Sequence, residues 1–406
     1  MSKHGRTFAP LFAIIILAES ARVGWRGKHG DFGPVLSVVN HIGAGQPLYA
    51  GNPKGPAYVY SPTFALLLAP LDVLPDPLIR SLWYLCSWAA LIGSWMLSRR
   101  ILFGAPRSTS LPRGYWVLAI APMWHFAYYN ALNGQTTPLM MFLVLLSYYL
   151  DQRDKPLLAG LSLAGSLLIK PFPIIFLGFY LLRRRLRTPL GAIAWLSLLL
   201  LLPILYFRNA YDTVLKDWLS VNRQQQTIYD ISDWGHQSLS ALWYRIFDWQ
   251  RPPPFLSDPS DPVFWAIWAS IALVVLSTIL FTLRSNRHRD PAADHATFAL
   301  YMLCWAMLPP TSWKHYYVVL IFPLAVLAKY ALLPNTTPRL ARISLKLLVF
   351  SFFGITLLHI APDDYKRQVF EYSPYLFMAL SVFATLCTAH WLQARSPSTT
   401  PQHDPA

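Results

Sequence analysis

Long hydrophobic runs separated by short polar segments dominate this sequence. A helix needs about 20 apolar residues to cross the hydrocarbon of a bilayer, and fewer where it is broken inside protein. The pattern predicts about twelve transmembrane helices, at residues 8–24, 77–98, 114–129, 135–151, 157–169, 172–182, 189–207, 263–283, 296–309, 315–333, 342–360 and 374–393. We expect an all-α polytopic membrane protein with one transmembrane domain, residues 1–393, and a disordered cytoplasmic tail, residues 394–406.

Three hydrophobic segments are short for a complete crossing. Segments 157–169 and 172–182 flank Lys170 and two nearby prolines, which favours helices broken around a protein-buried cavity. Segment 61–75 would invert the topology of everything after it if it spanned the membrane. We interpret it as a re-entrant or interfacial helix.

The distribution of charge orients the predicted helices. The chain has 34 Lys and Arg against 19 Asp and Glu, a net charge of +15, and arginines cluster in short loops near residues 99–100, 183–187 and 284–289. This is the positive-inside pattern, which places both termini in the cytoplasm and argues against nucleic acid as a partner. Loops 25–60 and 208–262 then lie outside, in a multi-pass protein of the inner or plasma membrane.

The first outside loop also carries a helical pattern. Val35, Val38, Val39 and Ile42 recur at the spacing of one helix face. The pattern predicts a short amphipathic helix that lies on the membrane surface.

Polar residues from distant parts of the chain meet at the outer face in this topology. Cations there suit a phosphate, a carboxylate suits proton abstraction from a hydroxyl, and the surrounding lipid suits a substrate with a polyisoprenyl tail. No acidic cluster predicts a metal and no phosphate-binding glycine motif predicts a nucleotide, so we expect neither metal nor cofactor. The candidate residues are Asp31, Gln135 in the Asn133-Gly134-Gln135 turn, Lys170, His236 and Gln237 with Arg245, and His315.

Each candidate also has a purely structural interpretation. The alternatives are a helix N-cap for Asp31, turn-forming and capping roles for the turn at 133–135, snorkelling for Lys170, an interfacial aromatic belt around His315 and a surface charge for Arg245.

An ordered series of motifs resembles glycosyltransferase family 87, whose type members are mannosyltransferases that use polyprenyl-phosphate mannose. The resemblance spans about residues 25–335. The motifs are HGDFGPV, GQPLYAG, YVYSPTFALLLAPLDVLP, NGQTTPLMMFLVLL, AGLSLAGSLLIKPFPIIF, HQSLSALWYR and PPTSWKHYY.

The resemblance implies a GT-C fold, a bundle of membrane helices whose active site opens outward. It implies that Asp31 is the catalytic base, and that His315 and Lys170 are functional. His236 departs from the family, which more often has Asn before Gln-Ser.

We therefore expect an inverting hexosyltransferase, with mannose as the favoured sugar. It would use a polyprenyl-phosphate donor and a glycolipid or glycan acceptor, with Lys170, His315, Arg245, Gln135, His236 and Gln237 in substrate binding. The alternatives are a transporter, a lipid-linked oligosaccharide ligase or flippase, and a membrane scaffold. A transporter would favour ionisable residues near the membrane midplane, whereas this chain gathers them at one face.

Overall fold

The computed structural model describes residues 3–26, 30–49, 58–104, 114–228, 231–247, 262–287, 290–333 and 336–394. Within these ranges the regular structure is helical, apart from one isolated bridge between His236 and Trp313. The all-α prediction is therefore confirmed for the described part of the chain. The tail after Ala394, predicted to be disordered, lies outside it.

The helices follow one another along the chain with short connections. The first half contains α1 (Lys3–Trp25), η1 (Gly30–Phe32), α2 (Gly33–Gly43), α3 (Pro62–Leu68), η2 (Ala69–Val73), α4 (Asp76–Phe103), α5 (Tyr115–Ile120), η3 (Ala121–Met123), α6 (Trp124–Leu132), α7 (Thr137–Asp151), α8 (Pro156–Ile169), η4 (Phe172–Ile174), α9 (Ile175–Leu182) and α10 (Arg187–Phe207). The second half contains η5 (Arg208–Ala210), α11 (Tyr211–Ile228), α12 (Leu239–Ile246), α13 (Pro262–Ser285), α14 (Pro291–Met307), η6 (Lys314–Leu320), α15 (Ile321–Leu332), α16 (Pro338–Ile360), α17 (Asp363–Glu371) and α18 (Pro374–Ala394).

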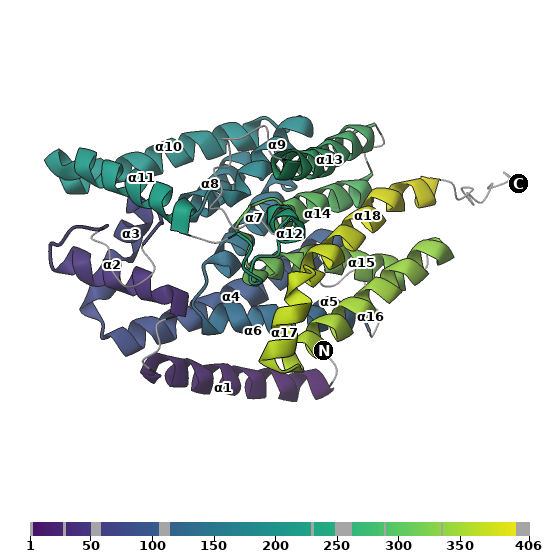
Figure 1. Ribbon diagram of the computed structural model, residues 1–406, viewed down its shortest axis with the longest axis horizontal. Coiled ribbons are helices and arrows are strands. Elements are labelled where there is room, and N and C mark those ends of the chain that lie inside the picture. The colour runs from purple at the N-terminus through teal and green to yellow at the C-terminus, as the bar shows by residue number, and fades with distance from the viewer. Residues whose placement is uncertain are drawn as a thin grey trace, which may run out of the picture.

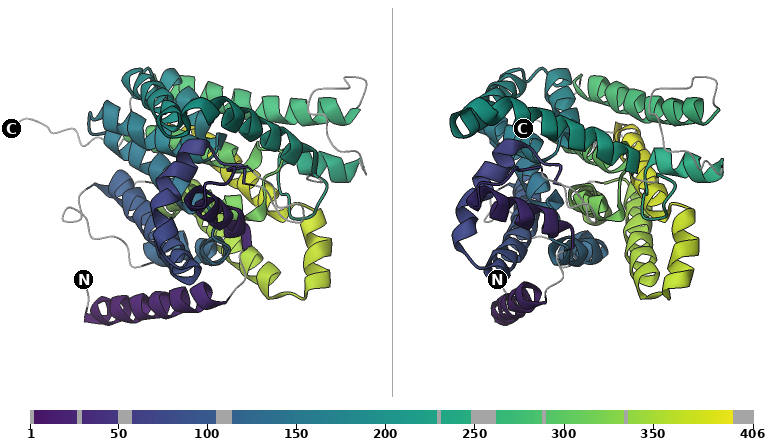
Figure 2. Two further views of the ribbon diagram at one scale, coloured as in Figure 1. Left: turned by 90° about the vertical axis from the view of Figure 1, so that its left-hand side faces the viewer. Right: turned by 60° about the vertical axis from the view of Figure 1, so that its left-hand side comes forward.

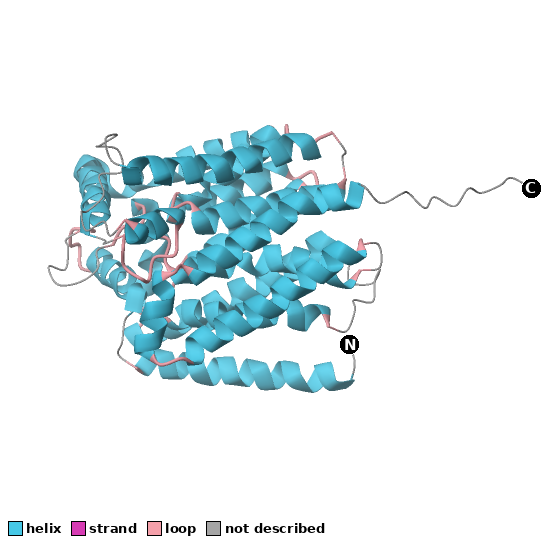
Figure 3. Ribbon diagram, turned by 45° about the vertical axis from the view of Figure 1, so that its right-hand side comes forward, coloured by secondary structure: helices cyan, strands magenta, loops and turns pink. Residues whose placement is uncertain are grey.

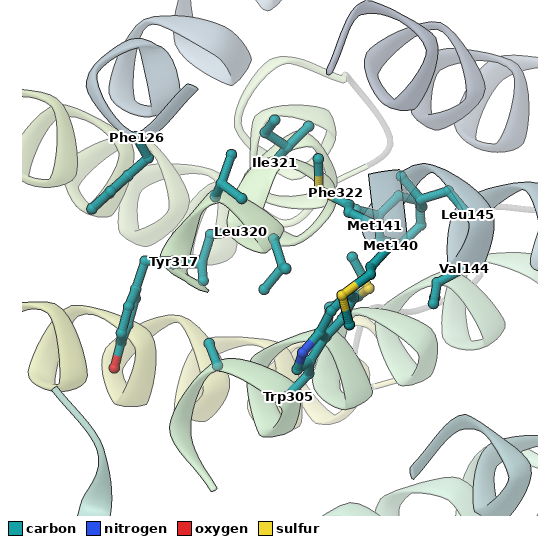
Figure 4. Packing of buried hydrophobic residues seen from close by; sticks show 14 of the residues in the cluster. Phe126, Met140, Met141, Val144, Leu145, Trp305, Tyr317, Leu320, Ile321 and Phe322 are labelled. Atoms are coloured by element: carbon teal, nitrogen blue, oxygen red, sulfur yellow. The ribbon is translucent and has the colours of Figure 1, made fainter. Parts of the chain in front are cut away.

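The continuous segment of η6 and α15 forms the centre of the bundle. Its residues are mostly buried, whereas only about a fifth of the residues are buried in the most apolar stretches of α10, α13 and α16. Figure 4 shows Leu320, Ile321 and Phe322 of this segment packed near Met140 and Met141 of α7. In Figure 1, α10 and α13 lie along one edge of the molecule and α1 along the opposite edge, and the turned views in Figure 2 keep this order. The exposed apolar faces of the outer helices are typical of helices that contact lipid.

Four helical stretches in the described residues are long and apolar enough to cross a membrane. They are Arg187–Gln224, Pro262–Ser285, Lys314–Leu332 and Pro338–Ile360, and the bent pair Asp363–Glu371 with Pro374–Ala389 would make a fifth. These helices indicate a membrane protein, but the predicted count of twelve is not confirmed. Each predicted span is helical, yet α7 and α8 have only 15 and 14 residues, and segment 114–129 is divided into α5, η3 and α6 around Pro122.

The ambiguous segment 61–75 does not form a complete span. It folds as α3 followed by η2, and Pro62–Val73 belongs to the shorter apolar helices. Twelve helical residues are about 18 Å long, which is well short of a hydrocarbon core about 30 Å thick. The Thr63 hydroxyl donates to the Leu199 carbonyl at 2.8 Å, so α3 is anchored against α10.

The predicted helix in the first outside loop exists as α2, but its expected surroundings were wrong. Val35, Val38 and Val39 are buried against protein, with at most 1% of each residue exposed. They pack in the main hydrophobic core beside α3 and η2. The apolar face of α2 therefore covers the protein interior, and it is not available to lie on a membrane surface.

Two ends of the bundle carry different polar groups. The loop end contains η1, the turn at 133–135, Lys170, the segment 231–238 and the start of η6. The termini end contains the start of α1 and the end of α18, which both lie at the right-hand end of the molecule in Figure 3. The helix α7 joins the two, since Thr136 precedes it at the loop end and Asp151 ends it at the termini end.

A buried ionic cluster holds the termini end together. Asp294 at the start of α14 pairs with Arg183 at 2.5 Å and with Arg185 at 2.8 Å. Arg185 also pairs with Asp151 at 2.7 Å, and Arg183 donates to Asn286 after α13. Side chains from α7, α9, α13 and α14 thus meet in one network. Sequence reasoning assigned these arginines only to membrane orientation.

Candidate active site

Asp31 is held at the loop end by close packing of two turns. Gly30 has a φ of +48°, and a Cβ atom there would lie 3.2 Å from the Asn133 carbonyl oxygen. Phe32 stacks on Trp83 with ring centroids 5.0 Å apart, and the Trp83 indole donates to the Gly134 carbonyl at 2.9 Å. Because glycine tolerates this backbone conformation, η1 approaches the 133–135 turn closely enough to place Asp31 beside it.

The Asp31 carboxylate accepts a hydrogen bond from the Gln135 side-chain amide. Phe32, not Asp31, is the N-cap of α2, and the cap has no side-chain hydrogen bond. The N-cap interpretation of Asp31 is therefore wrong. The Gln135 amide donates to this carboxylate and does not cap α7, whose N-cap is Thr136.

The protein around Asp31 controls its acidity. Asp31 is an exposed residue, but protein on one side of its carboxyl raises the pKa above the ordinary value of 3.8 by desolvation. The positive charge of Lys170 and the hydrogen bond from Gln135 both act in the opposite direction. The Asp31 carboxyl is therefore subject to two opposing effects, desolvation that favours its neutral form and a nearby lysine that favours its ionised form, which is a suitable environment for a general base.

Lys170 lies at the break between α8 and η4. It follows α8 in an extended conformation, with φ −146° and ψ 146°, as expected for a residue before proline. Its ammonium donates to the Tyr316 hydroxyl at 3.2 Å and lies 5.2 Å from the centre of the Tyr60 ring. The side chain therefore points into the protein between two tyrosines, and the snorkelling interpretation is wrong.

The HQS and WKH motifs are paired in space. His236 forms the isolated bridge with Trp313, and their rings are 4.6 Å apart. The backbone N–H of Gln237 donates to the Ser312 carbonyl at 2.7 Å, and that of Lys314 donates to the Gly235 carbonyl at 3.1 Å. Two segments that are 75 residues apart in sequence thus form one structural unit beside the start of η6.

His315 occupies a buried position at the start of this central segment. Only 7% of the residue is exposed, which excludes the interfacial belt interpretation. The Asn130 amide donates to the His315 carbonyl at 2.9 Å, and Nε2 of the ring has no hydrogen-bond partner among the described residues. Lys170, Lys314 and His236 all interact electrostatically with His315. His315 therefore links the two halves of the candidate site and keeps one ring nitrogen available.

Arg245 and the Gln237 side chain have contacts that fit a structural role. The Arg245 guanidinium donates to the carbonyls of Asp233, His236 and Glu371 at 2.9–3.1 Å, and also to the Ser373 hydroxyl. The Gln237 amide donates to the carbonyls of Trp234 and Phe370 at 2.9 and 3.0 Å.

These contacts fix the segment 231–238 against α17. Burial lowers the pKa of Arg245 to about 10, and its donors face backbone oxygens, so the structure gives no support to an Arg245–phosphate contact.

Sequence reasoning missed three side chains of the site. Tyr60 and Tyr316 surround the Lys170 ammonium, and the Lys314 ammonium lies 5.0–5.1 Å from the rings of Trp234 and Tyr129. All three belong to motifs in which only the neighbouring residue attracted attention. The position of Lys314, next to His315 in an apolar segment, could have marked it as a candidate, because charged residues inside such segments usually have a function.

The loop end of the bundle therefore combines the carboxylate of Asp31, the ammonium group of Lys170 and the imidazole of His315. Such groups can abstract a proton and receive an anion. Among the described residues, no group of three or more His, Cys, Asp or Glu side chains could hold a metal ion.

The sequence profile of glycosyltransferase family 87 matches residues 58–309. This is more than half of the chain. The chain belongs to glycosyltransferase family 87. The matched region includes Gln135, Lys170 and the HQS motif, whereas Asp31 lies well before it and His315 shortly after it.

Two curated glycosyltransferases are similar to the chain. A polyprenol-phosphate-mannose-dependent alpha-(1-2)-phosphatidylinositol mannoside mannosyltransferase of Mycobacterium tuberculosis is 25% identical over 348 residues, 80% of this chain and 74% of the relative. An alpha-(1->3)-arabinofuranosyltransferase of Corynebacterium glutamicum is 24% identical over 303 residues, 72% of this chain and 66% of the relative. No solved structure matches the chain. Membership of the family and these two relatives support a membrane-embedded glycosyltransferase.

Proposed function

We propose that this family 87 member transfers a hexose, with mannose as the first candidate, from a polyprenyl-phosphate donor to a lipid or glycan acceptor. The observation that carries the proposal is the Asp31 carboxylate, held by Gln135 within the electrostatic reach of Lys170. A base and a cation at the same place suit a reaction that removes a proton and releases a phosphate.

In the proposed reaction, the acceptor hydroxyl oxygen forms a bond to the anomeric carbon of the sugar. The bond from that carbon to the phosphate oxygen breaks, and its electron pair leaves on the lipid phosphate. Asp31 accepts the hydroxyl proton, and attack opposite the leaving group inverts the anomeric configuration. Lys170 and His315 stabilise the charge that develops on the phosphate. A phosphate leaving group needs no proton, so one carboxylate is sufficient, unlike the pair used in glycoside hydrolysis.

The two relatives suggest different sugars, since one is named for mannose and the other for arabinofuranose. The purified protein should be incubated with polyprenyl phosphates bearing mannose, glucose, galactose or arabinofuranose, and release of free polyprenyl phosphate should be measured. We expect release from the mannose donor in the presence of a membrane-lipid acceptor extract. Release from the arabinofuranose donor alone would replace the hexose with a pentose, and release from none would refute the proposed donor class.

We also propose that the loop end faces away from the cytoplasm, because the arginines within residues 183–187 and 284–287 gather at the termini end. In a variant without the three native cysteines, Lys216→Cys on exposed α11 should react with an impermeant thiol reagent in intact cells. Arg187→Cys should react only after the cells are opened. The reverse labelling would place the site in the cytoplasm.

A further inference from the structure

The Lys314 ammonium is a cation at the loop end that the proposed reaction does not use. Lys314 is half-buried at the start of η6. Its ammonium lies 5.0 Å from the centre of the Trp234 ring and 5.1 Å from that of Tyr129. The Phe370 ring of α17 is slightly farther away, at 5.8 Å. Aromatic rings from three separate segments therefore surround this ammonium.

No oxygen of the protein neutralises this cation. Within the described residues, neither an ion pair nor a hydrogen bond joins the Lys314 ammonium to a carboxylate or a carbonyl. The half-buried Lys329 ammonium, by contrast, donates to the Leu102 carbonyl at 3.0 Å. An aromatic face attracts a cation, but it does not replace the oxygen acceptors that the three N–H bonds of an ammonium require. Lys314 therefore keeps donors available for an acceptor outside the protein.

The two carboxylates that interact electrostatically with Lys314 are held by other groups. They are Asp233 and Asp363. Oδ1 of Asp233 accepts the Gly235 backbone N–H at 2.6 Å. Asp363 pairs instead with Lys366 at 3.1 Å, and Lys366 adds a second positive charge near Lys314. An anion that reached Lys314 would therefore meet a cation without a bound carboxylate.

The position of Lys314 connects it to the candidate active site. The Tyr129 ring that contacts its ammonium also interacts electrostatically with Asp31. Lys314 is bonded to His315, which interacts electrostatically with both Lys170 and Lys314. An anion at Lys314 would thus lie beside the reacting groups, one side-chain layer away from the proposed base.

This distance excludes the phosphate of the donor as the ligand of Lys314. The donor phosphate is bonded directly to the anomeric carbon, so it has to lie next to Asp31, where Lys170 and His315 are proposed to stabilise it. A second anion beyond Tyr129 has to belong to another molecule. The other reactant is the acceptor, whose hydroxyl is proposed to lie at Asp31.

We propose that Lys314 binds a phosphate or carboxylate group of the acceptor, so that the enzyme selects an anionic acceptor and presents its hydroxyl to Asp31. The assignment rests on the proposed function and adds the charge class of its acceptor. Lys170 and Lys314 then serve different substrates, the first the donor and the second the acceptor. A cation that merely held the three aromatic segments together would favour neither substrate.

The charge of the acceptor is the first test, and it uses the unmodified protein. The membrane-lipid extract should be separated on an anion exchanger into an anionic and a neutral fraction. Transfer of labelled sugar into each fraction should then be measured with the donor that the protein uses. We expect label in the anionic fraction. Transfer into the neutral fraction alone, or equal transfer into both, would overturn the assignment.

The variant Lys314→Met is the second test, because methionine keeps apolar contact with the rings but has no charge. KM should be measured separately for the donor and for the anionic fraction. We expect KM for the acceptor fraction to rise about tenfold or more, from the loss of one charge-assisted contact, and KM for the donor to stay the same. Lys314→Arg should recover most of the loss. Lys216→Met, an exposed lysine on α11, should match the unmodified protein.

An unchanged KM for the acceptor in Lys314→Met would overturn the assignment. Equal rises in KM for both substrates would overturn it too, since Lys314 would then only hold the aromatic segments together. If Lys314→Met did not fold, the two fractions would still decide the question with the unmodified protein. Failure of the unmodified protein to release polyprenyl phosphate from any donor would refute the proposed function itself, which is a different result from transfer to a neutral acceptor.

Discussion

At the residue scale, the candidate site depends on Asp31 and Lys170 acting on each other. Desolvation raises the pKa of the Asp31 carboxyl, and the charge of Lys170 opposes that rise. The lysine therefore has two effects in the proposed reaction. It keeps the base ionised before transfer, and it is one of the cations available to the leaving phosphate.

The pH dependence of transfer tests the first of these effects. Asp31 must be ionised to accept a proton, so kcat should fall as the pH decreases through its pKa, and this acid limb should lie above pH 3.8. Lys170→Met removes the charge that lowers this pKa, so the acid limb should move to higher pH. The measurement is a profile of kcat against pH for both proteins.

The same variant should also weaken donor use at neutral pH. Loss of one charge-assisted contact costs about 1.5–3 kcal/mol, or roughly 10- to 150-fold in kcat/KM. Lys216→Met, an exposed lysine on α11, is the control and should behave as the unmodified protein. If Lys170→Met kept the acid limb of the kcat profile at the same pH and had normal turnover, Lys170 would have no role in the reaction.

At the element scale, turns and helix breaks position the chemistry. The 133–135 turn brings Gln135 to Asp31, the break after α8 aims Lys170 inward, and the pairing of 235–237 with 312–314 fixes His315. Long hydrophobic runs predicted where the apolar helices lie, although the predicted count of twelve spans is not confirmed. The sequence pattern could not predict the contacts between these turns and breaks, because two loops that pack against each other leave no periodic signal in either one.

Gly134 tests the packing of the two turns. It has a φ of +67°, and an added Cβ would lie 2.5 Å from Cβ of Phe32. Gly134→Ala should displace η1 and with it Asp31, so turnover should drop roughly 10- to 100-fold. Gly178→Ala is a matched control, since a Cβ there meets no atom within 4 Å and alanine favours helix. Equal turnover in the two variants would show that this contact does not position the base.

Particular residues show how far the sequence leads. Asp31, Lys170 and His315 were found as polar residues in apolar or loop contexts, and the structure brings them into electrostatic contact. Arg245 looked equivalent to them, but backbone carbonyls take up its guanidinium. Residue type alone does not distinguish a cation that awaits a ligand from one that already has protein acceptors. That difference depends on chain segments far apart in sequence.

At the scale of the whole molecule, the two ends of the bundle differ in whether their polar side chains are paired. The loop end keeps polar groups near an available histidine nitrogen, whereas the termini end neutralises Arg183 and Arg185 with Asp151 and Asp294. Buried ion pairs contribute little net stability when complete, but removal of one partner leaves an uncompensated charge. The ion pairs at the termini end therefore fix the ends of the helices that they join.

Asp294→Asn tests this structural role. Its side chain is 7% exposed, so the two arginines would keep a single carboxylate between them. We expect destabilisation of about 3–5 kcal/mol, measured as a lower thermal unfolding midpoint in detergent. Asp212→Asn removes one member of an exposed pair on α11 and should leave the midpoint unchanged. A wild-type midpoint for Asp294→Asn would contradict the cluster's role.

Turnover of Asp31→Asn tests the central claim most directly. Asparagine keeps the shape of the side chain and an oxygen that can accept the Gln135 hydrogen bond, but it cannot take a proton at neutral pH. Transfer should fall by a factor on the order of 100 or more, while binding of polyprenyl phosphate and the thermal unfolding midpoint stay normal. Wild-type turnover in Asp31→Asn would contradict the account, because the base would then have to be another residue.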